Sequence, residues 1–353
     1  MKTNKNIAHK ILLSHGSGGR LMHELINKLV IARVRSRVLR KGDDAAVYAL
    51  NNLGITKAGP DERVVMSTDS FVVNPLFFPG GDIGKLAVCG TVNDVAMMGG
   101  VPRLLAVAGI IEEGLDLAVV DKVLASVIRT AESAGVEIVT GDTKVVERGM
   151  ADKMFITTTG IGFCNGEINL SGANARVGDV VIVSGNIGEH ELAVMNARKK
   201  LGFISSNIKS DCACLHNVIR SLLHAVPGVR VLRDPTRGGL ATTLNEITGQ
   251  SRVDIVVYEN KIPVSRHVKK AAEILGLDPL YMACEGRFVA IVPPQSAGKA
   301  LKSIRRHTVG HDAGIVGTVR KRESRVPKVV VNTQNGGERI ALMLEGEQLP
   351  RIC

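Results

Sequence analysis

The 353-residue chain is long enough for two domains of ordinary size, and its 45% hydrophobic and 22% charged residues are typical of a globular protein. It contains no apolar run that could span a bilayer and no signal-peptide core, so we expect a cytoplasmic protein with no membrane partner. The net charge of +11 comes from dispersed basic residues, and with only 3% aromatic residues this pattern disfavours nucleic acid as a partner.

Short apolar strands alternate with helical patterns from residue 63 onward. A helix over 82–99 begins at the capping residue Asp82, and a helix over 115–135 repeats apolar residues every three or four positions and stops at Gly135. These elements make one α/β unit of domain size. The strands expected around the two helices are 63–69, 103–111, 136–142 and 154–163.

The polar, glycine-rich segment 165–179 marks the boundary to a second α/β unit, which continues to Leu344. The last stretch, EGEQLPRIC, shows no period. The expected fold class is therefore α/β (α+β) with two domains. The expected divisions are an N-terminal glycine-rich segment and helix over 1–34, domains over 35–165 and 175–343, and a mobile tail over 344–353.

Acidic residues occur in four motifs at strand ends or on helix faces, where a residue that packs in a core is normally apolar. Asp94 shares a helical face with Ile83, Ala87 and Gly90, and a carboxylate there is costly to bury unless it is paired or binds a metal. A turn or a cap explains any one such acid, but four together favour Mg²⁺ and a substrate phosphate. The four motifs are GDDAAV (Asp43, Asp44), STDSF (Thr68, Asp69), TVNDVAMMG (Asn93, Asp94) and VTGDTKVV (Asp142, Lys144).

Two glycine-containing loops suit a phosphate or another anion. SHGSGGRL supplies Gly16, Gly18 and Gly19 before a helix that starts near Arg20, although it is neither a Walker A loop nor a Rossmann fingerprint. A flexible loop has the same composition. RDPTRGGL is either a second anion site or a tight loop with an ion pair, and its charged residues are Arg233, Asp234 and Arg237.

The six cysteines include no C-x-x-C pair and fit reduced thiols. CACLH, with Cys212, Cys214 and His216, lacks a second group of zinc ligands, so a helix that begins after Asp211 is favoured over a metal site. Cys353 ends the chain, and it is either incidental or a thiol carried on a mobile arm.

Several of these motifs together resemble the carbamoyl dehydratases of nickel–iron hydrogenase maturation, over nearly the whole chain. The resemblance implies a two-domain, aminoimidazole ribonucleotide synthetase-like architecture with a flexible C-terminal tail. It also implies a homodimer paired through residues 35–165 and an ATP cleft bounded by both subunits. Cys214 departs from the family, where a proline is expected. The matching stretches are HGSGGRLMHELI, GDDAAV, STDSFVVNPLFFPGGDIGKLAVCGTVNDVAMMGG, TGDTKVV, RDPTRGGLATTLNEI and PRIC.

The reaction implied by this resemblance gives the last residue a purpose. A carbamoyltransferase would load a carbamoyl group onto Cys353, and this protein would use ATP to remove water from it and leave a thiocyanate. The cyano group would then pass to iron on a hydrogenase maturation scaffold complex. Phosphorylation of the amide oxygen makes it a good leaving group, so catalysis requires positioning and charge neutralisation.

The site residues that follow from the resemblance are hypotheses. Lys144 would neutralise the transferring phosphoryl group, with a salt bridge to Asp142 as the alternative, and Glu285 would be the base at the amide nitrogen, with a turn residue as the alternative. The expected Mg²⁺ ligands are Asp43, Asp69, Asp94 and Asp142; the expected ATP contacts are Gly16, Gly18, Gly19, Asp44, Thr68 and Asn93.

Two other functions fit parts of the sequence. A kinase or ligase of the same superfamily, acting on a diffusible small molecule, would use the same acids but would not need Cys353. A basic scaffold or nucleic-acid-binding protein would need no nucleotide chemistry at all and would bind with a steep salt dependence.

Overall fold

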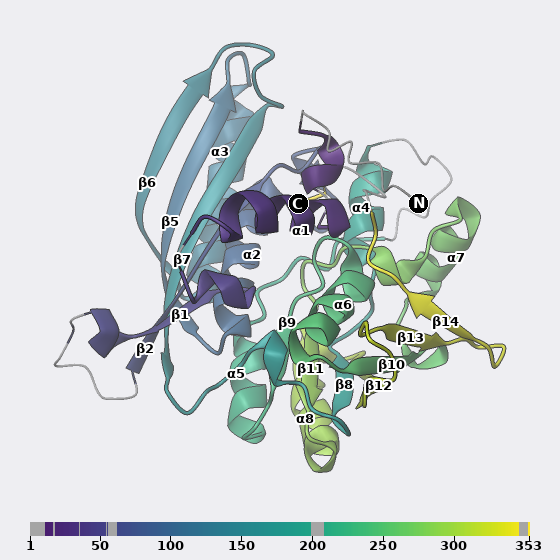
Figure 1. Ribbon diagram of the computed structural model, residues 1–353. Helices are drawn as coiled ribbons and strands as arrows, with labels where there is room; N and C mark the ends of the chain where they lie inside the picture. The colour runs from purple at the N-terminus through teal and green to yellow at the C-terminus, as the bar shows by residue number, and fades with distance from the viewer. Residues whose placement is uncertain are drawn as a thin grey trace.

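A computed structural model describes residues 11–16, 18–34, 36–53, 55, 62–198, 208–345 and 352–353. Two sheets, each with helices packed against it, lie side by side and form the two halves of the fold (Figure 1). Within these ranges no helix is long and apolar enough to cross a membrane.

The N-terminal sheet has the strand order β1-β2-β7-β5-β6, in which β5 and β6 are parallel and the other neighbours are antiparallel. Helices α2 and α3 pack against it, and their apolar side chains form a core with the sheet (Figure 1). The elements are α1 (Arg20–Ile26), β1 (Ala46–Ala49), β2 (Glu62–Phe71), β3 (Phe77–Phe78), β4 (Gly81–Asp82), α2 (Ile83–Met97), β5 (Val101–Glu112), α3 (Leu117–Ala134), β6 (Glu137–Val146) and β7 (Met154–Asn165).

Helix α2 begins where the sequence predicts, because Asp82 caps it. Its Oδ1 accepts hydrogen bonds from the backbone N–H groups of Gly84 (2.8 Å) and Lys85 (3.1 Å), and its Oδ2 accepts one from Ser126 Oγ on α3 (2.7 Å). One side chain therefore starts α2 and ties it to α3. The face of α2 that carries Gly90 packs closely, since a Cβ on Gly90 would lie 2.8 Å from the ring of Phe71.

Strand β6 is longer than the sequence suggests. The expected strand stops at Asp142, but β6 stays in register with β5 as far as the pair Glu112–Val146. Asp142 and Lys144 therefore lie within a strand at the edge of the sheet rather than in a loop after it. Pairing with the parallel strand β5 extends β6 past Gly141, and the local sequence does not reveal that pairing.

The C-terminal sheet has the order β14-β13-β10-β12-β8-β11-β9. Helix α6 packs on one face of it, and α5 and α8 pack on the other. Its elements are β8 (Val180–Val183), α4 (Glu189–Ala197), α5 (His216–Ala225), β9 (Val231–Arg233), α6 (Gly239–Ser251), β10 (Asp254–Tyr258), α7 (Arg266–Leu275), β11 (Val289–Val292), α8 (Ala297–Ile304), β12 (Gly314–Arg320), β13 (Val329–Asn332) and β14 (Glu338–Ala341).

Asn93 joins the two halves. Its side-chain amide donates to the carbonyl of Ala213 (3.0 Å), and its Oδ1 accepts from the N–H of Leu215 (2.8 Å). Asn93 is 1% exposed, so these hydrogen bonds satisfy a buried amide and fix the segment before α5 against α2.

The cap of α2 yields a stability prediction. Asp82→Ala removes a cap and a link to α3, and we expect it to cost about 1–2 kcal/mol and to lower the urea midpoint. The matched control is Asp116→Ala, which removes the exposed cap of α3, a single hydrogen bond to Ala118 N–H. Equal losses for the two variants would contradict the linking role of Asp82.

Candidate active site

A cavity of about 700 Å³ lies where the two halves of the fold meet. Its walls come from the residues before β1, from β2 and α2, from the segment before α1, and from the loop between β9 and α6. The predicted site residues that line it are Gly18, Asp43, Asp44, Thr68, Asp69, Asp94, Glu285 and Cys353.

The carboxyl groups of the cavity raise one another's pKa. Burial is the main cause of the raised pKa of Asp94, and the nearby charges of Asp234, Asp44 and Asp69 add to it. Burial likewise raises the pKa of Asp44 and Asp69, and it raises the pKa of Asp234 to about 6. Mutual repulsion of this kind is relieved when a cation binds between the carboxylates.

Arg233 holds the acidic cluster in place. Its Nε pairs with Asp44 Oδ1 (2.8 Å), its Nη2 pairs with Glu246, and its Nη1 donates to the carbonyl of Gly42 (2.7 Å). Sequence reasoning left RDPTRGGL open between an anion site and an ion pair, and for Arg233 the ion pair is correct. Glu246 was not singled out, because its partner lies on another element and no local spacing reveals the pair.

The residues around the cavity suit Mg²⁺ held together with a phosphate. Asp44 Oδ2 is buried and has no hydrogen-bond partner, and carboxylate oxygens are the ligands that Mg²⁺ prefers. In the described ranges no three Asp, Glu, His or Cys residues form a ready-made metal cage. Asp43 instead accepts hydrogen bonds from Ser171 Oγ (2.9 Å) and Gly172 N–H (3.0 Å).

The glycine-rich segment lies against the loop before α6. Gly18 has a φ of +77°, and a Cβ there would be 2.7 Å from Arg237 Cβ. Arg237 Nη1 donates to the carbonyl of Gly16 (2.7 Å), and Gly19 precedes the first residue of α1. The two glycine-containing loops of the sequence therefore form one wall, and Gly18 is the predicted glycine that reaches the cavity.

The end of the chain lies inside this cavity. Ile352 is 6% exposed and packs in the same apolar cluster as Phe71 and Phe78, and Cys353 lines the cavity. Burial raises the pKa of the Cys353 thiol, so it is held as a protonated thiol. In the rest of the predicted tail, the carbonyl of Leu344 accepts a hydrogen bond from the N–H of Arg20 (2.8 Å), and residues 346–351 lie outside the described residues.

Glu285 is a buried carboxyl group close enough to influence this thiol. It is 3% exposed, its Oε1 has no hydrogen-bond partner, and burial raises its pKa well above the usual range. Its negative charge contributes to the raised pKa of Cys353. The backbone around it is fixed, since its N–H donates to Asp211 Oδ1 (3.2 Å).

Five of the predicted site residues do not line this cavity within one chain, for identifiable reasons. Asp142 and Lys144 are exposed on β6 and form the salt bridge that was the alternative interpretation, with Nζ and Oδ2 2.7 Å apart. Asn93 is occupied by its hydrogen bonds to the segment before α5. Gly16 and Gly19 flank Gly18 but are not part of the lining.

The CACLH motif lies directly before α5 and brings Cys214 next to Cys89. Helix α5 begins at His216, as the favoured interpretation predicts, and Cys214 Sγ lies 3.4 Å from Cys89 Sγ on α2. Hydrogen bonding to Cys89 is the main cause of a Cys214 pKa lowered to about 6, and His216 contributes. Burial instead raises the pKa of Cys284 and of Cys353.

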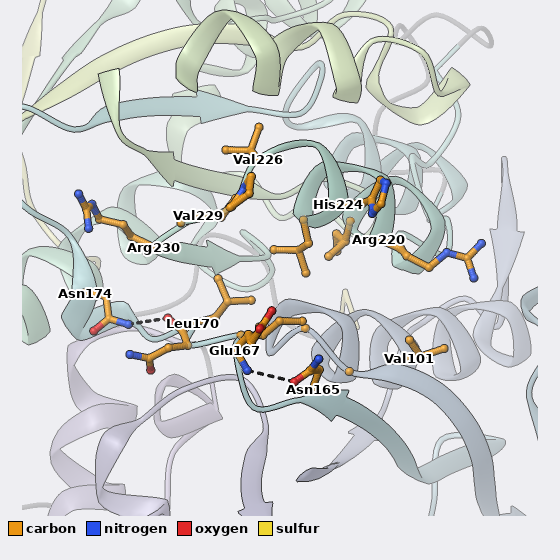
Figure 2. A pocket seen from close by; sticks show the side chains of 18 of the residues that line it. Val101, Asn165, Glu167, Leu170, Asn174, Arg220, His224, Val226, Val229 and Arg230 are labelled. Carbon is orange, nitrogen blue, oxygen red and sulfur yellow. Dashed lines mark hydrogen bonds between the residues drawn. The ribbon is translucent and has the colours of Figure 1, made fainter. Parts of the chain in front are cut away.

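A second cavity, of about 580 Å³, contains none of the predicted site residues. Figure 2 shows the apolar side chains of Leu170, Val226 and Val229 between Arg230 on one side and Arg220 on the other. Arg230 is already paired with Asp179 (2.8 Å). Because its charged groups stand apart, this cavity lacks the convergent polar groups of a catalytic site.

Comparison with known proteins places the chain in a family. Models of the AIR synthase related protein match its N-terminal domain to residues 42–164 and its C-terminal domain to residues 176–329. The carbamoyl dehydratase HypE of Cupriavidus necator is 49% identical over 98% of this chain and 95% of its own length.

Two solved structures extend the likeness to three dimensions. A crystal structure of the hydrogenase maturation protein HypE in complex with ATP is 46% identical, with a TM-score of 0.80 over 98% of this chain and 100% of that one. The HypE chain of a HypE–HypF complex is 43% identical, with a TM-score of 0.82 over 92% of this chain and 100% of that one. The chain therefore belongs to the carbamoyl dehydratase HypE family, within the AIR synthase-related proteins.

Proposed function

We propose that this chain is an ATP-dependent dehydratase that carries its substrate on its own last residue, in the maturation of nickel–iron hydrogenase. The observation that carries the proposal is the position of Cys353 in the same cavity as the acidic motifs. Family membership supports it, because the relatives named above are carbamoyl dehydratases and hydrogenase maturation proteins.

ATP is the proposed co-substrate, and its phosphates would face the acidic wall. The HypE structure with ATP supports this assignment. Asp69 and Asp94 would bind Mg²⁺ together with the buried oxygen of Asp44, and Gly18 would let the backbone approach the phosphates. When bound, Mg²⁺ would neutralise phosphate charge and fix the orientation of the transferred group.

The proposed reaction has two steps and balances in atoms and charge. The carbonyl oxygen of the S-carboxamide on Cys353 attacks the γ-phosphorus of ATP; ADP leaves and one N–H proton is lost. Phosphate then leaves with that oxygen as the second N–H proton is removed, and Cys353 carries a thiocyanate. The reaction needs no redox partner.

Glu285 is the proposed proton acceptor. A carboxyl group with a raised pKa is a stronger base once it is ionised, and the unpartnered Oε1 is free to receive a proton. Excluding water from the site protects the phosphorylated intermediate from hydrolysis, and the buried side chain of Ile352 beside the thiol contributes to this exclusion.

The partners proposed here are a carbamoyltransferase, a maturation scaffold complex that receives the cyano group, and a second copy of the chain. The HypE–HypF complex supports the first of these. Residues from Glu137 to Val145 of β6 are all exposed in the single chain, including Val139 (50%) and Val145 (69%). Pairing through β6 would cover this apolar edge and could bring Asp142 and Lys144 to the other subunit's cavity.

The small-molecule kinase or ligase remains the second candidate. It explains the acidic motifs equally well, but it gives no reason for Cys353 to line the cavity or for Ile352 beside it to be buried.

The carrier thiol is tested by the mass of the C-terminal peptide. After incubation with the carbamoyltransferase, carbamoyl phosphate and ATP, we expect a carbamoyl adduct on the peptide ending in Cys353, followed by loss of one water. Cys353→Ala should abolish the adduct, and the control Cys214→Ser should keep it although Cys214 is the more acidic thiol. An adduct on any other cysteine would contradict the proposal.

The acidic cluster is tested by stability as a function of pH. Because the pKa of Asp94 is raised in the folded state, folding takes up protons, and stability without Mg²⁺ should fall as the pH rises above about 4. Asp94→Asn should flatten this slope, lose the stabilisation by Mg²⁺ and lose Mg²⁺-dependent ATP turnover. The control Asp254→Asn changes a buried carboxylate away from the cavity and should retain both Mg²⁺ effects.

The homodimer is tested by mixing two inactive variants. We assume that Asp142 of one subunit acts in the cavity that contains Asp94 of the other. A dimer of one Asp94→Asn subunit and one Asp142→Asn subunit then has one intact site, which combines the unchanged Asp94 of one subunit with the unchanged Asp142 of the other. Subunit exchange at equal concentrations should then restore about a quarter of the wild-type ATP turnover. Light scattering that shows an active monomer, or mixing that restores nothing, would rule out the shared site.

A further inference from the structure

Two hydrogen bonds hold the last two residues of the chain by their backbone. The N–H of Val72 donates to the backbone oxygen of Cys353 (3.2 Å), and His190 Nε2 lies 2.6 Å from the carbonyl oxygen of Ile352. Since Ile352 is also buried, the chain end has one definite position in the cavity.

Packing against Phe78 and contacts at both ring nitrogens fix the position of His190. It lies in the first turn of α4, is fully buried, and packs edge-on against Phe78 with ring centroids 5.3 Å apart. Its Nδ1 lies 2.8 Å from Ser210 Oγ. The backbone N–H of Ser210 in turn donates to the carbonyl of Pro79 (2.7 Å), which fixes the backbone of Ser210.

The hydrogen-bond pattern determines the tautomer of His190. Ser210 Oγ accepts from the N–H of Cys212 (3.0 Å) and has a proton available to donate to Nδ1 of His190. Burial lowers the pKa of His190, so the ring is neutral and has a single N–H. That N–H must be at Nε2, where it donates to Ile352; the other tautomer would set two acceptors against each other at 2.6 Å.

We propose that His190, oriented by Ser210, is a positioning residue that holds the carrier thiol in the cavity. The catalytic consequence rests on the proposed function, but the docking itself does not. A carrier arm must leave the cavity to be loaded and return to it to react. An attachment made of two hydrogen bonds, each with a modest net contribution, and one buried side chain suits such a reversible docking.

The experiment is alkylation of Cys353 in the full-length protein with iodoacetamide at pH 8, followed by peptide mass analysis. In the wild type, alkylation requires undocking, because the thiol is buried and its pKa is raised. Loss of the hydrogen bond in His190→Ala should raise the Cys353 rate roughly three- to tenfold. The rate at Cys214, the internal reference, should not change.

Two further variants separate positioning from a general effect on folding. His190→Gln keeps an N–H donor and should restore part of the protection of Cys353. Ser210→Ala keeps the imidazole but removes the group that fixes its tautomer, and should also speed alkylation, which preserves the test if His190→Ala does not fold. Unchanged Cys353 alkylation in folded His190→Ala or Ser210→Ala would overturn the proposal.

A second measurement connects docking to chemistry. When Cys353 is already carbamoylated, His190→Ala should slow the ATP-dependent loss of water in a single turnover. Failure of wild-type Cys353 to be carbamoylated would refute the proposed function and leave the alkylation result standing. Normal wild-type carbamoylation with unchanged alkylation in the variant would refute the role of His190 alone.

Discussion

The burial of several carboxyl groups around one arginine is the constraint on which the cavity depends. Asp44, Asp94 and Asp234 repel one another, and Arg233 offsets only part of that charge because it is shared with Glu246. Such a cluster is costly to the folded protein when it is empty and favourable when a cation is bound. We propose that this cluster binds a metal ion together with a polyphosphate at the junction of the two domains.

The same junction explains how two distant parts of the chain meet. Asn93 and Asp94 are neighbours on α2, and they serve opposite purposes: Asn93 fixes the segment before α5, while Asp94 faces the cavity. The backbone of Glu285 is attached to that segment through Asp211. A change in the packing of α2 would therefore move both the acidic wall and the proposed base.

Sequence reasoning was most successful where a local signal decides the outcome. Asp82 lies at the start of α2 and Gly135 at the end of α3, as predicted. Most of the acidic motifs contribute residues to one cavity. It was less successful where the outcome depends on distant partners. The length of β6 depends on β5, and no local pattern indicates that Ile352 would fill an apolar site beside Phe71 and Phe78.

The central claim is that the oxygen of a carboxamide on Cys353 is phosphorylated within this cavity and leaves as phosphate. It is tested most directly by loading Cys353 with a carbamoyl group labelled with ¹⁸O at its carbonyl oxygen and following one turnover with unlabelled ATP. The account predicts that the label appears in inorganic phosphate, with one labelled phosphate for each thiocyanate formed. Label that appears in water, with unlabelled phosphate, would contradict it.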